Sequence, residues 1–178
     1  MENKAVFFDR DGIVNLKLYN DYVKNIDEFI FLDDFFDTFK IVKSMGFLAF
    51  LVTNQQGIGK GLFTESDLKE IHTYLQNQLA ERTGFKFDEI SFAPNLAIEN
   101  DFRRKPNPGM ILELMQKYNI SPSKAIMIGD SYSDILAAKN AGIRSIQISK
   151  YTYEISPDFH FYSLKELNFR LQNILMEL

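Results

Sequence analysis

The chain contains no cysteine and only two histidines among its 178 residues. Without cysteine there is no thiolate nucleophile, no disulfide, no cysteine-ligated zinc and no iron–sulfur cluster, and two separate histidines leave little for a histidine-rich metal centre. Long hydrophobic runs are missing too. The first apolar run, at residues 5–8, is too short for a signal-peptide core or a membrane span. We therefore expect a cytoplasmic protein with no membrane partner.

Basic residues are also in the minority, since the formal net charge is −4 and the pI is about 5.2. A surface that holds a nucleic-acid backbone is expected to be basic overall, so we expect no nucleic-acid partner. A small anionic substrate is still compatible with this charge, because only a local pocket needs to be positive. No linker, repeat or low-complexity run divides the sequence. We expect one domain over residues 1–178, and a monomer.

The apolar residues are arranged as an α/β protein. Short apolar runs alternate with stretches of helical spacing, which is typical of βα units around a mostly parallel sheet. Most runs are continuous rather than alternating, as expected of strands that are covered on both faces. The predicted strands cover residues 5–8, 48–52, 90–93, 125–128 and 143–148.

Several helices are indicated between these strands. Thr64 and Asp67 have the spacing of a capping box, and Gly84 is placed to end the helix that they begin. Apolar spacing predicts further helices over residues 35–42, after Pro108, over about 133–140 and over 164–178.

The residues that follow the predicted strands are unusually polar. In an open parallel sheet, ligands bind beyond the C-terminal ends of the strands. Carboxylates, a hydroxyl, an amide and an ammonium group are therefore expected to converge on one edge of the sheet. They belong to Asp9 and Asp11 after the first strand, Thr53 and Asn54 after the second, Asp130 after the fourth, and Lys105 before the helix that leads to the fourth.

This collection of side chains favours a metal-assisted phosphate site. Aspartates that meet in a partly dry site raise one another's pKa unless a cation lies among them. Oxygen ligands select a hard ion, and Mg²⁺ held by a few carboxylates and a substrate phosphate fits best. Lysine, threonine and backbone N–H groups nearby would complete an anion site. The sequence thus predicts Mg²⁺ and a small phosphorylated metabolite as its ligands.

Four segments carry a resemblance to a known family. FFDRDGIVN, LVTNQQGIGKGLFT, RRKPNPGM and MIGDSYSDILAAKNAG resemble, in order and spacing, the four motifs of the haloacid dehalogenase superfamily of phosphohydrolases. Within it, the first three are similar to the histidinol phosphatase and D-glycero-D-manno-heptose 1,7-bisphosphate phosphatase group. The resemblance spans residues 5–148. It implies a Rossmann-like, three-layer αβα fold, dependence on Mg²⁺, and hydrolysis of a phosphate monoester through a phospho-aspartate.

The resemblance also implies roles for individual residues. Asp9 matches the nucleophile and Asp11 the general acid, which protonates the leaving oxygen and later activates water. This chemistry needs one ionised and one proton-donating carboxyl group. The motifs place Mg²⁺ on Asp9, Asp130 and the backbone carbonyl of Asp11, and the transferring phosphoryl group on Thr53 and Lys105.

The chain departs from the group's pattern at three places. Many members carry a cysteine and histidine zinc loop before the third motif, but residues 93–103 contain neither residue, so no zinc is expected there. Ser131 stands where the group often has lysine, and the loop at residues 16–21 is about two residues longer.

The spacing between motifs leaves no room for a cap domain, which usually needs at least about 50 residues. We expect a capless enzyme in which Asp134 orients a metal-bound water.

Candidate substrates differ in whether they carry a second phosphate. A heptose bisphosphate has a second phosphate for Arg104 and Lys60, and Asn54 is a further candidate contact. Histidinol phosphate is the nearest alternative. A non-enzymatic phospho-acceptor signalling module would gather similar residues, but its phosphorylated aspartate follows the third strand. Here the third predicted strand ends in Ala93 and Pro94, which favours the phosphatase.

Overall fold

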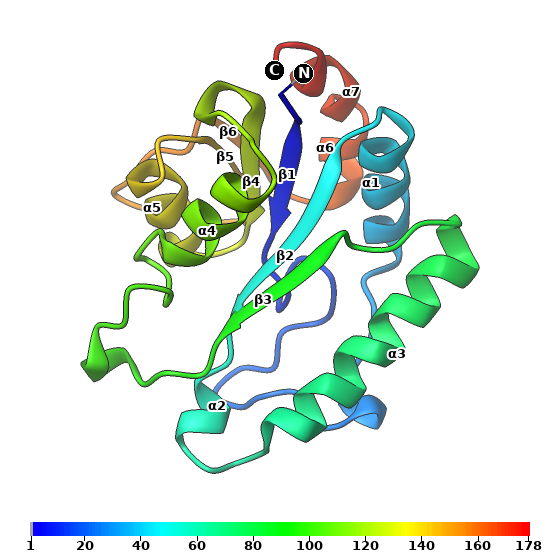
Figure 1. Ribbon diagram of the computed structural model, residues 1–178. Coiled ribbons are helices and arrows are strands. Elements are labelled where there is room, and N and C mark those ends of the chain that lie inside the picture. The colour runs from blue at the N-terminus through cyan, green and yellow to red at the C-terminus, as the bar shows by residue number, and fades with distance from the viewer. Residues whose placement is uncertain (1) are drawn as a thin grey trace.

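A six-stranded parallel sheet forms the centre of the protein, with strand order β3-β2-β1-β4-β5-β6 (Figure 1). The computed structural model describes residues 2–178. The first five strands lie where the sequence predicts them, to within two residues. The sixth was missed, since it is only three half-buried residues long. The strands are β1 (Ala5–Phe8), β2 (Leu48–Asn54), β3 (Glu89–Ala93), β4 (Ala125–Gly129), β5 (Arg144–Ile148) and β6 (Phe159–Phe161).

The predicted start and end of the longest helix, α3, are confirmed. The Thr64 hydroxyl accepts a hydrogen bond from the Asp67 N–H, the Asp67 carboxylate accepts one from the Thr64 N–H, and Gly84 adopts a left-handed φ of 80°. The helices are α1 (Asp33–Ser44), α2 (Gln56–Gly59), α3 (Glu65–Thr83), α4 (Gly109–Lys117), α5 (Tyr132–Asn140), α6 (Leu164–Asn168) and α7 (Leu171–Met176), with single 3₁₀ turns at Ile26–Glu28, Ala97–Glu99 and Pro122–Lys124.

The prediction of one continuous helix over residues 164–178 is wrong. The chain turns at Phe169 and Arg170, so that α6 and α7 are separate. Leu167 and Leu171, on either side of the turn, are both fully buried. Apolar residues therefore recur at helical spacing across the break, and the sequence pattern alone could not reveal it.

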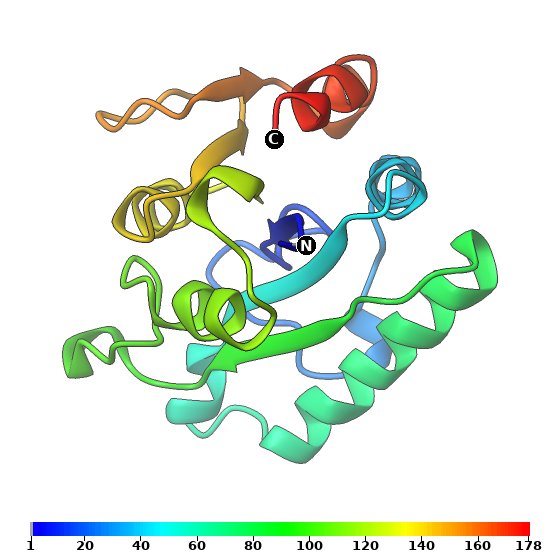
Figure 2. The same ribbon diagram turned by 45° about the horizontal axis from the view of Figure 1, so that its top comes forward.

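Helices cover both faces of the sheet (Figure 2). Val6 and Phe8 of β1 belong to a core shared with α1, α3, α6 and α7, whereas Ala5 and Phe7 belong to a second core shared with α4 and α5. Successive residues of a strand point to opposite faces, so one short strand contributes to both cores. The predicted three-layer α/β architecture is confirmed.

This topology brings three strand ends to one edge of the sheet. β1 pairs with β2 on one side and with β4 on the other, so the residues that follow these three strands are neighbours. The segments between β1, β2 and β3 contain only α1, α2, α3, one 3₁₀ turn and their loops, with no inserted cap. Among residues 2–178, no helix combines the length and the apolar character needed to cross a bilayer.

Candidate active site

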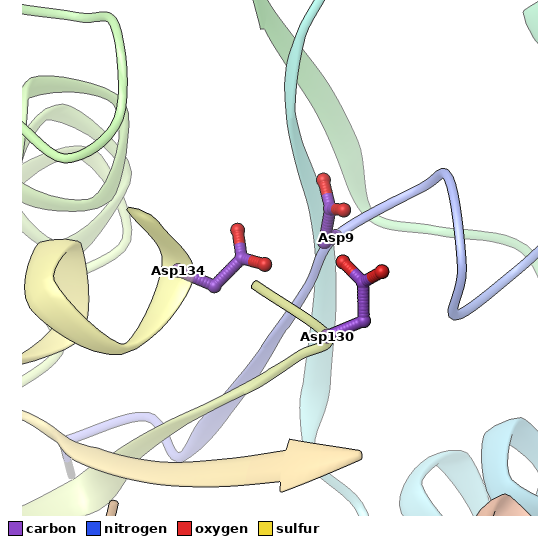
Figure 3. Close-up of side chains that lie close together, drawn as sticks. All are labelled: Asp9, Asp130 and Asp134. Carbon is purple, nitrogen blue, oxygen red and sulfur yellow. The ribbon is translucent and has the colours of Figure 1, made fainter. Parts of the chain in front are cut away.

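Three carboxylates meet at the carboxyl edge of the sheet (Figure 3). Asp9 directly follows β1, Asp130 directly follows β4, and Asp134 lies in the first turn of α5. One carboxylate oxygen from each residue lies within 4.8 Å of those from the other two. The sequence predicts that Asp9 and Asp130 meet here with Asp134 beside them, and the structure brings these three carboxylates together.

Lys105 neutralises part of this cluster. Its Nζ lies 2.7 Å from Oδ1 of Asp9 and 2.7 Å from Oδ1 of Asp134, and it also donates a hydrogen bond to the carbonyl oxygen of Val52. The residue is only 3% exposed. Burial alone would lower the pKa of its ammonium group, but the adjacent Asp134 and Asp9 carboxylates raise that pKa above its usual value. Lys105 therefore remains a cation inside the site.

One ammonium group does not balance the cluster. Burial, together with the charge of Asp134, raises the pKa of Asp9 to about 7, even though Lys105 acts in the opposite direction. Burial and the charge of Asp134 also raise the pKa of Asp130. Carboxyl groups whose pKa values are raised by each other's charge are stabilised in the ionised form by an additional cation.

The surroundings of Asp130 suit a hard metal ion. Its Oδ1 atom is buried and has no hydrogen-bond partner among the described residues. Its carboxylate also lies against Gly12, which has a φ of 100°, and a Cβ atom on Gly12 would be 2.4 Å from Oδ2 of Asp130. Glycine is therefore required at this position for both its conformation and its size. An unpaired carboxylate oxygen beside Asp9 fits Mg²⁺, which prefers oxygen ligands.

Asp11 lies in a different environment. Its Oδ1 accepts hydrogen bonds from Nη2 of Arg10 at 3.0 Å and from Nδ2 of Asn15 at 2.9 Å, and its Oδ2 accepts one from Nε2 of Gln55 at 3.1 Å. Burial raises the pKa of Asp11, but the charge and the hydrogen bonds of these neighbours outweigh it, so the pKa is lowered overall. The resemblance implies that Asp11 is the carboxyl group that donates a proton, which would suit a higher pKa for Asp11 than for Asp9. In this structure the pKa of Asp9 is raised and the pKa of Asp11 is lowered.

The end of β2 holds this arrangement together. Asn54 exchanges two hydrogen bonds with the backbone of Lys105: its Nδ2 donates to the carbonyl oxygen at 2.8 Å, and its Oδ1 accepts from the N–H at 3.0 Å. The Lys105–Pro106 peptide bond is cis. Gln55, a residue that the sequence analysis did not single out, donates from Nε2 to both Thr53 Oγ1 and Asp11. The signal in the sequence that could have identified Gln55 is its position directly after β2.

The two expected substrate-binding cations are near the site but are held by other groups. Arg104 donates to the carbonyl oxygen of Asn95 at 3.0 Å and to Oε1 of Gln56 at 3.3 Å. It lines a cavity of about 230 Å³ that also reaches Lys105. Lys60 is exposed, and its Nζ donates to the hydroxyl of Tyr22 at 3.0 Å.

A cavity of about 170 Å³ opens beside the carboxylates. Asp9, Asp11, Asn54 and Lys105 line it, as the sequence analysis expected. The loop at residues 17–23 forms much of the remaining wall. The longer loop at residues 16–21, noted in the sequence, thus contributes Lys17, Leu18 and Asp21 to the wall of the cavity beside the carboxylates.

Known proteins are similar to this chain in sequence and in fold. A sequence profile of haloacid dehalogenase-like hydrolases matches residues 8–148. The chain is 39% identical, over 80% of its length and 82% of the relative's, to the D-glycero-beta-D-manno-heptose-1,7-bisphosphate 7-phosphatase of Helicobacter pylori. It is 36% identical, over 80% and 78% of the two lengths, to the D-glycero-alpha-D-manno-heptose-1,7-bisphosphate 7-phosphatase of Burkholderia mallei. The crystal structure of the D,D-heptose 1,7-bisphosphate phosphatase of B. bronchiseptica, complexed with magnesium and phosphate, is similar to 96% of this chain and 99% of its own, with a TM-score of 0.85 and 26% identity.

Proposed function

This chain belongs to the haloacid dehalogenase-like hydrolases and is a phosphatase, and we propose that it removes one phosphate from a heptose 1,7-bisphosphate with the help of Mg²⁺. The observation that carries the proposal is the contact of buried Lys105 with Asp9, next to Asp130 and at the wall of an open cavity. The relatives named for this substrate provide further support.

In the proposed reaction, Asp9 is the nucleophile. Its carboxylate oxygen attacks phosphorus as the bond between phosphorus and the sugar oxygen breaks, which leaves a phospho-aspartate. Lys105, 2.7 Å from Asp9, favours the ionised form of this carboxylate and faces the negative charge that develops on the phosphoryl oxygens. Thr53 is proposed as a second phosphoryl contact. Its hydroxyl accepts a hydrogen bond from Nε2 of Gln55 and donates none among residues 2–178, so its proton is available to a phosphoryl oxygen.

Asp11 is the proposed general acid and base. It protonates the departing sugar oxygen, and afterwards it takes a proton from the water that hydrolyses the phospho-aspartate. Arg10 and Gln55 favour its ionised form, which suits the second of these steps. For the first step, a substrate dianion in the cavity would raise the pKa of Asp11 by like-charge repulsion.

The proposed Mg²⁺ ligands are Asp9, Asp130 and the backbone carbonyl of Asp11. Asp134 is proposed to position these ligands without binding the ion itself. Asp134 has the contacts for this role, because Lys105 and the hydroxyl and N–H of Ser131 all engage its carboxylate. When bound, Mg²⁺ would offset negative charge on the carboxylates and on the phosphoryl group.

Metal removal is the first test. EDTA should abolish phosphatase activity and Mg²⁺ should restore it, because the acidic cluster needs a cation to accept a phosphate dianion. Elemental analysis of the purified protein should find no stoichiometric zinc, since residues 93–103 contain no cysteine or histidine. One zinc per chain, or full activity in EDTA, would contradict the proposal.

The substrate is tested by phosphate release from a panel. The α and β anomers of the heptose 1,7-bisphosphate, histidinol phosphate and an aryl phosphate should each be assayed. We expect kcat/KM to be highest for one of the bisphosphates, with the phosphate at position 7 released. A preference for histidinol phosphate would reverse the assignment. We further propose that the enzyme acts as a monomeric single domain, because every proposed catalytic residue comes from this one chain.

Recognition of the phosphate that is not cleaved gives a second test. Arg104 lies directly before Lys105 in a cavity that adjoins the catalytic one. The loss of a charge-assisted contact to phosphate costs on the order of 2 kcal/mol. Arg104→Ala should therefore lower kcat/KM for the bisphosphate at least about tenfold, with little change for an aryl phosphate.

Arg103→Ala is the matched control, because Arg103 pairs with Glu113 and Ser91 rather than facing either cavity. We expect it to leave both substrates unaffected. Equal losses on both substrates in Arg104→Ala would place Arg104 at the transferring phosphoryl group, and no loss would place it outside the substrate site.

A further inference from the structure

Lys17 places a second ammonium group on the acidic cluster. Its Nζ donates to Oδ2 of Asp130 at 2.7 Å. Lys105 contacts the other two carboxylates, those of Asp9 and Asp134. Each of the three carboxyl groups therefore has an ammonium neighbour, and three acidic groups face two basic ones.

The two ammonium groups differ in burial and in the number of their hydrogen-bond partners. Lys105 is almost fully buried and also bonds the carbonyl oxygen of Val52. The Lys17 side chain is 42% exposed, and within residues 2–178 Asp130 is the one hydrogen-bond partner of its ammonium group. An ion pair whose lysine side chain is exposed to this extent is weak, because water competes for the ammonium group. The ammonium group of Lys17 can therefore leave Asp130 at little cost.

Asp130, in contrast, cannot easily move. The backbone of Gly12 lies against its carboxylate so closely that a Cβ atom there would come within 2.4 Å of Oδ2. Oδ1 is buried and has no partner among the described residues. A cation that reaches the cluster thus meets a fixed carboxylate on which Lys17 already holds one oxygen.

We propose that Lys17 is a displaceable counter-ion of Asp130, which occupies this carboxylate until a divalent cation binds and which weakens the binding of that cation by competition. Two charges of the same sign cannot share one carboxylate at close range without a cost, so the arriving cation and the Lys17 ammonium group exclude each other. The inference rests on the proposed function only in taking the acidic cluster as the metal site.

A calorimetric titration with Mg²⁺ tests the competition without any substrate. Wild type, Lys17→Met and Lys150→Met are stripped with EDTA, dialysed and titrated. Methionine keeps much of the length of the side chain and removes its charge. The gain from deleting a weak competing ion pair corresponds to a Kd for Mg²⁺ about fivefold lower in Lys17→Met.

Lys150 is the matched control. It lines a neighbouring cavity of about 740 Å³ together with Lys17 and Asp130, so its removal changes the net charge of the same region. We expect Lys150→Met to keep the Kd within about twofold of wild type, because salt screens a charge that pairs with no carboxylate among residues 2–178. A conservative variant, Lys17→Arg, retains the positive charge and should keep an affinity close to that of wild type.

Thermal unfolding provides a readout that is independent of the titration. In EDTA, Lys17→Met should have a lower Tm than wild type, because Asp130 has lost its counter-ion. The rise in Tm on adding saturating Mg²⁺ should be larger in this variant than in wild type.

Three results would overturn the proposal: an unchanged or higher Kd in Lys17→Met, an equal tightening in Lys150→Met, or no Mg²⁺ binding by any of the proteins. Failure of the proposed function is a separate outcome. It would appear as absence of phosphate release from every substrate of the panel, while the affinity difference between wild type and Lys17→Met still decides the role of Lys17.

Discussion

Asp9→Asn is expected to reduce phosphate release by at least about 10³-fold, because it removes the proposed nucleophile with almost no change in volume. Asparagine keeps an oxygen near Lys105 but lacks the negative charge that attacks phosphorus. Phosphate release from the heptose bisphosphate in saturating Mg²⁺ is the measurement. The variant should be folded, since Asp9 lies at the end of β1 and is not part of either hydrophobic core.

Asp37→Asn provides the control for this substitution. Asp37 is an exposed residue of α1, and its replacement makes the same chemical change outside the site. We expect this variant to match wild type. If Asp9→Asn retained activity within about tenfold of wild type, in protein free of contaminating enzyme, Asp9 could not be the nucleophile.

The same variant should also change how stability depends on pH in EDTA. The pKa of Asp9 is about 7 in the folded protein, against an ordinary value of 3.8. Between these two values the folded state keeps a proton that the unfolded state has lost, so the free energy of unfolding falls as pH rises from about 4 to about 7. Asp9→Asn lacks this group. We therefore expect denaturant unfolding of the variant to show a smaller decrease over that range.

The position of the site could be predicted from the sequence because it depends on local rules. Apolar runs identified the first five strands, and polar residues such as Asp9 and Asp130 stood directly after them. In a parallel sheet whose neighbouring strands include β1 and β4, such residues must meet at one edge. The capping residues Thr64 and Asp67 and the left-handed Gly84 were predicted for the same reason, since each acts within a few residues of its own helix end.

Contacts between distant segments could not be predicted in this way. The hydrogen bond from Lys17 to Asp130 joins residues 113 positions apart, and it depends on the path of a loop that has no periodic pattern. Gln55, between Thr53 and Asp11, has a similar dependence on tertiary structure. The lowered pKa of Asp11 depends in part on its contact with Gln55, so the sequence could not indicate it.

Lys105→Met is expected to have the largest effect on stability. The substitution leaves the carboxylates of Asp9 and Asp134 buried without the ammonium group that lies 2.7 Å from each. Breaking a buried ion pair by removing one partner costs about 3–5 kcal/mol. In a chain of this length that corresponds to a decrease in Tm on the order of 10 °C in EDTA. Phosphate release should fall at least about 10²-fold, because the proposed stabilisation of the phosphoryl charge is also lost.

Mg²⁺ separates the two effects of Lys105→Met. A divalent cation bound at Asp9 and Asp130 would supply positive charge to the cluster, so saturating Mg²⁺ should restore part of the lost Tm. It should not restore turnover, because it does not supply the N–H donors of Lys105, which face the transferring phosphoryl group in the proposed reaction. Lys117→Met is the control: Lys117 forms an exposed ion pair with Glu89, and its loss should lower Tm by no more than about 2 °C. A variant of Lys105 that is as stable as this control in EDTA would show that the Asp9 and Asp134 carboxylates do not depend on Lys105 for their charge balance.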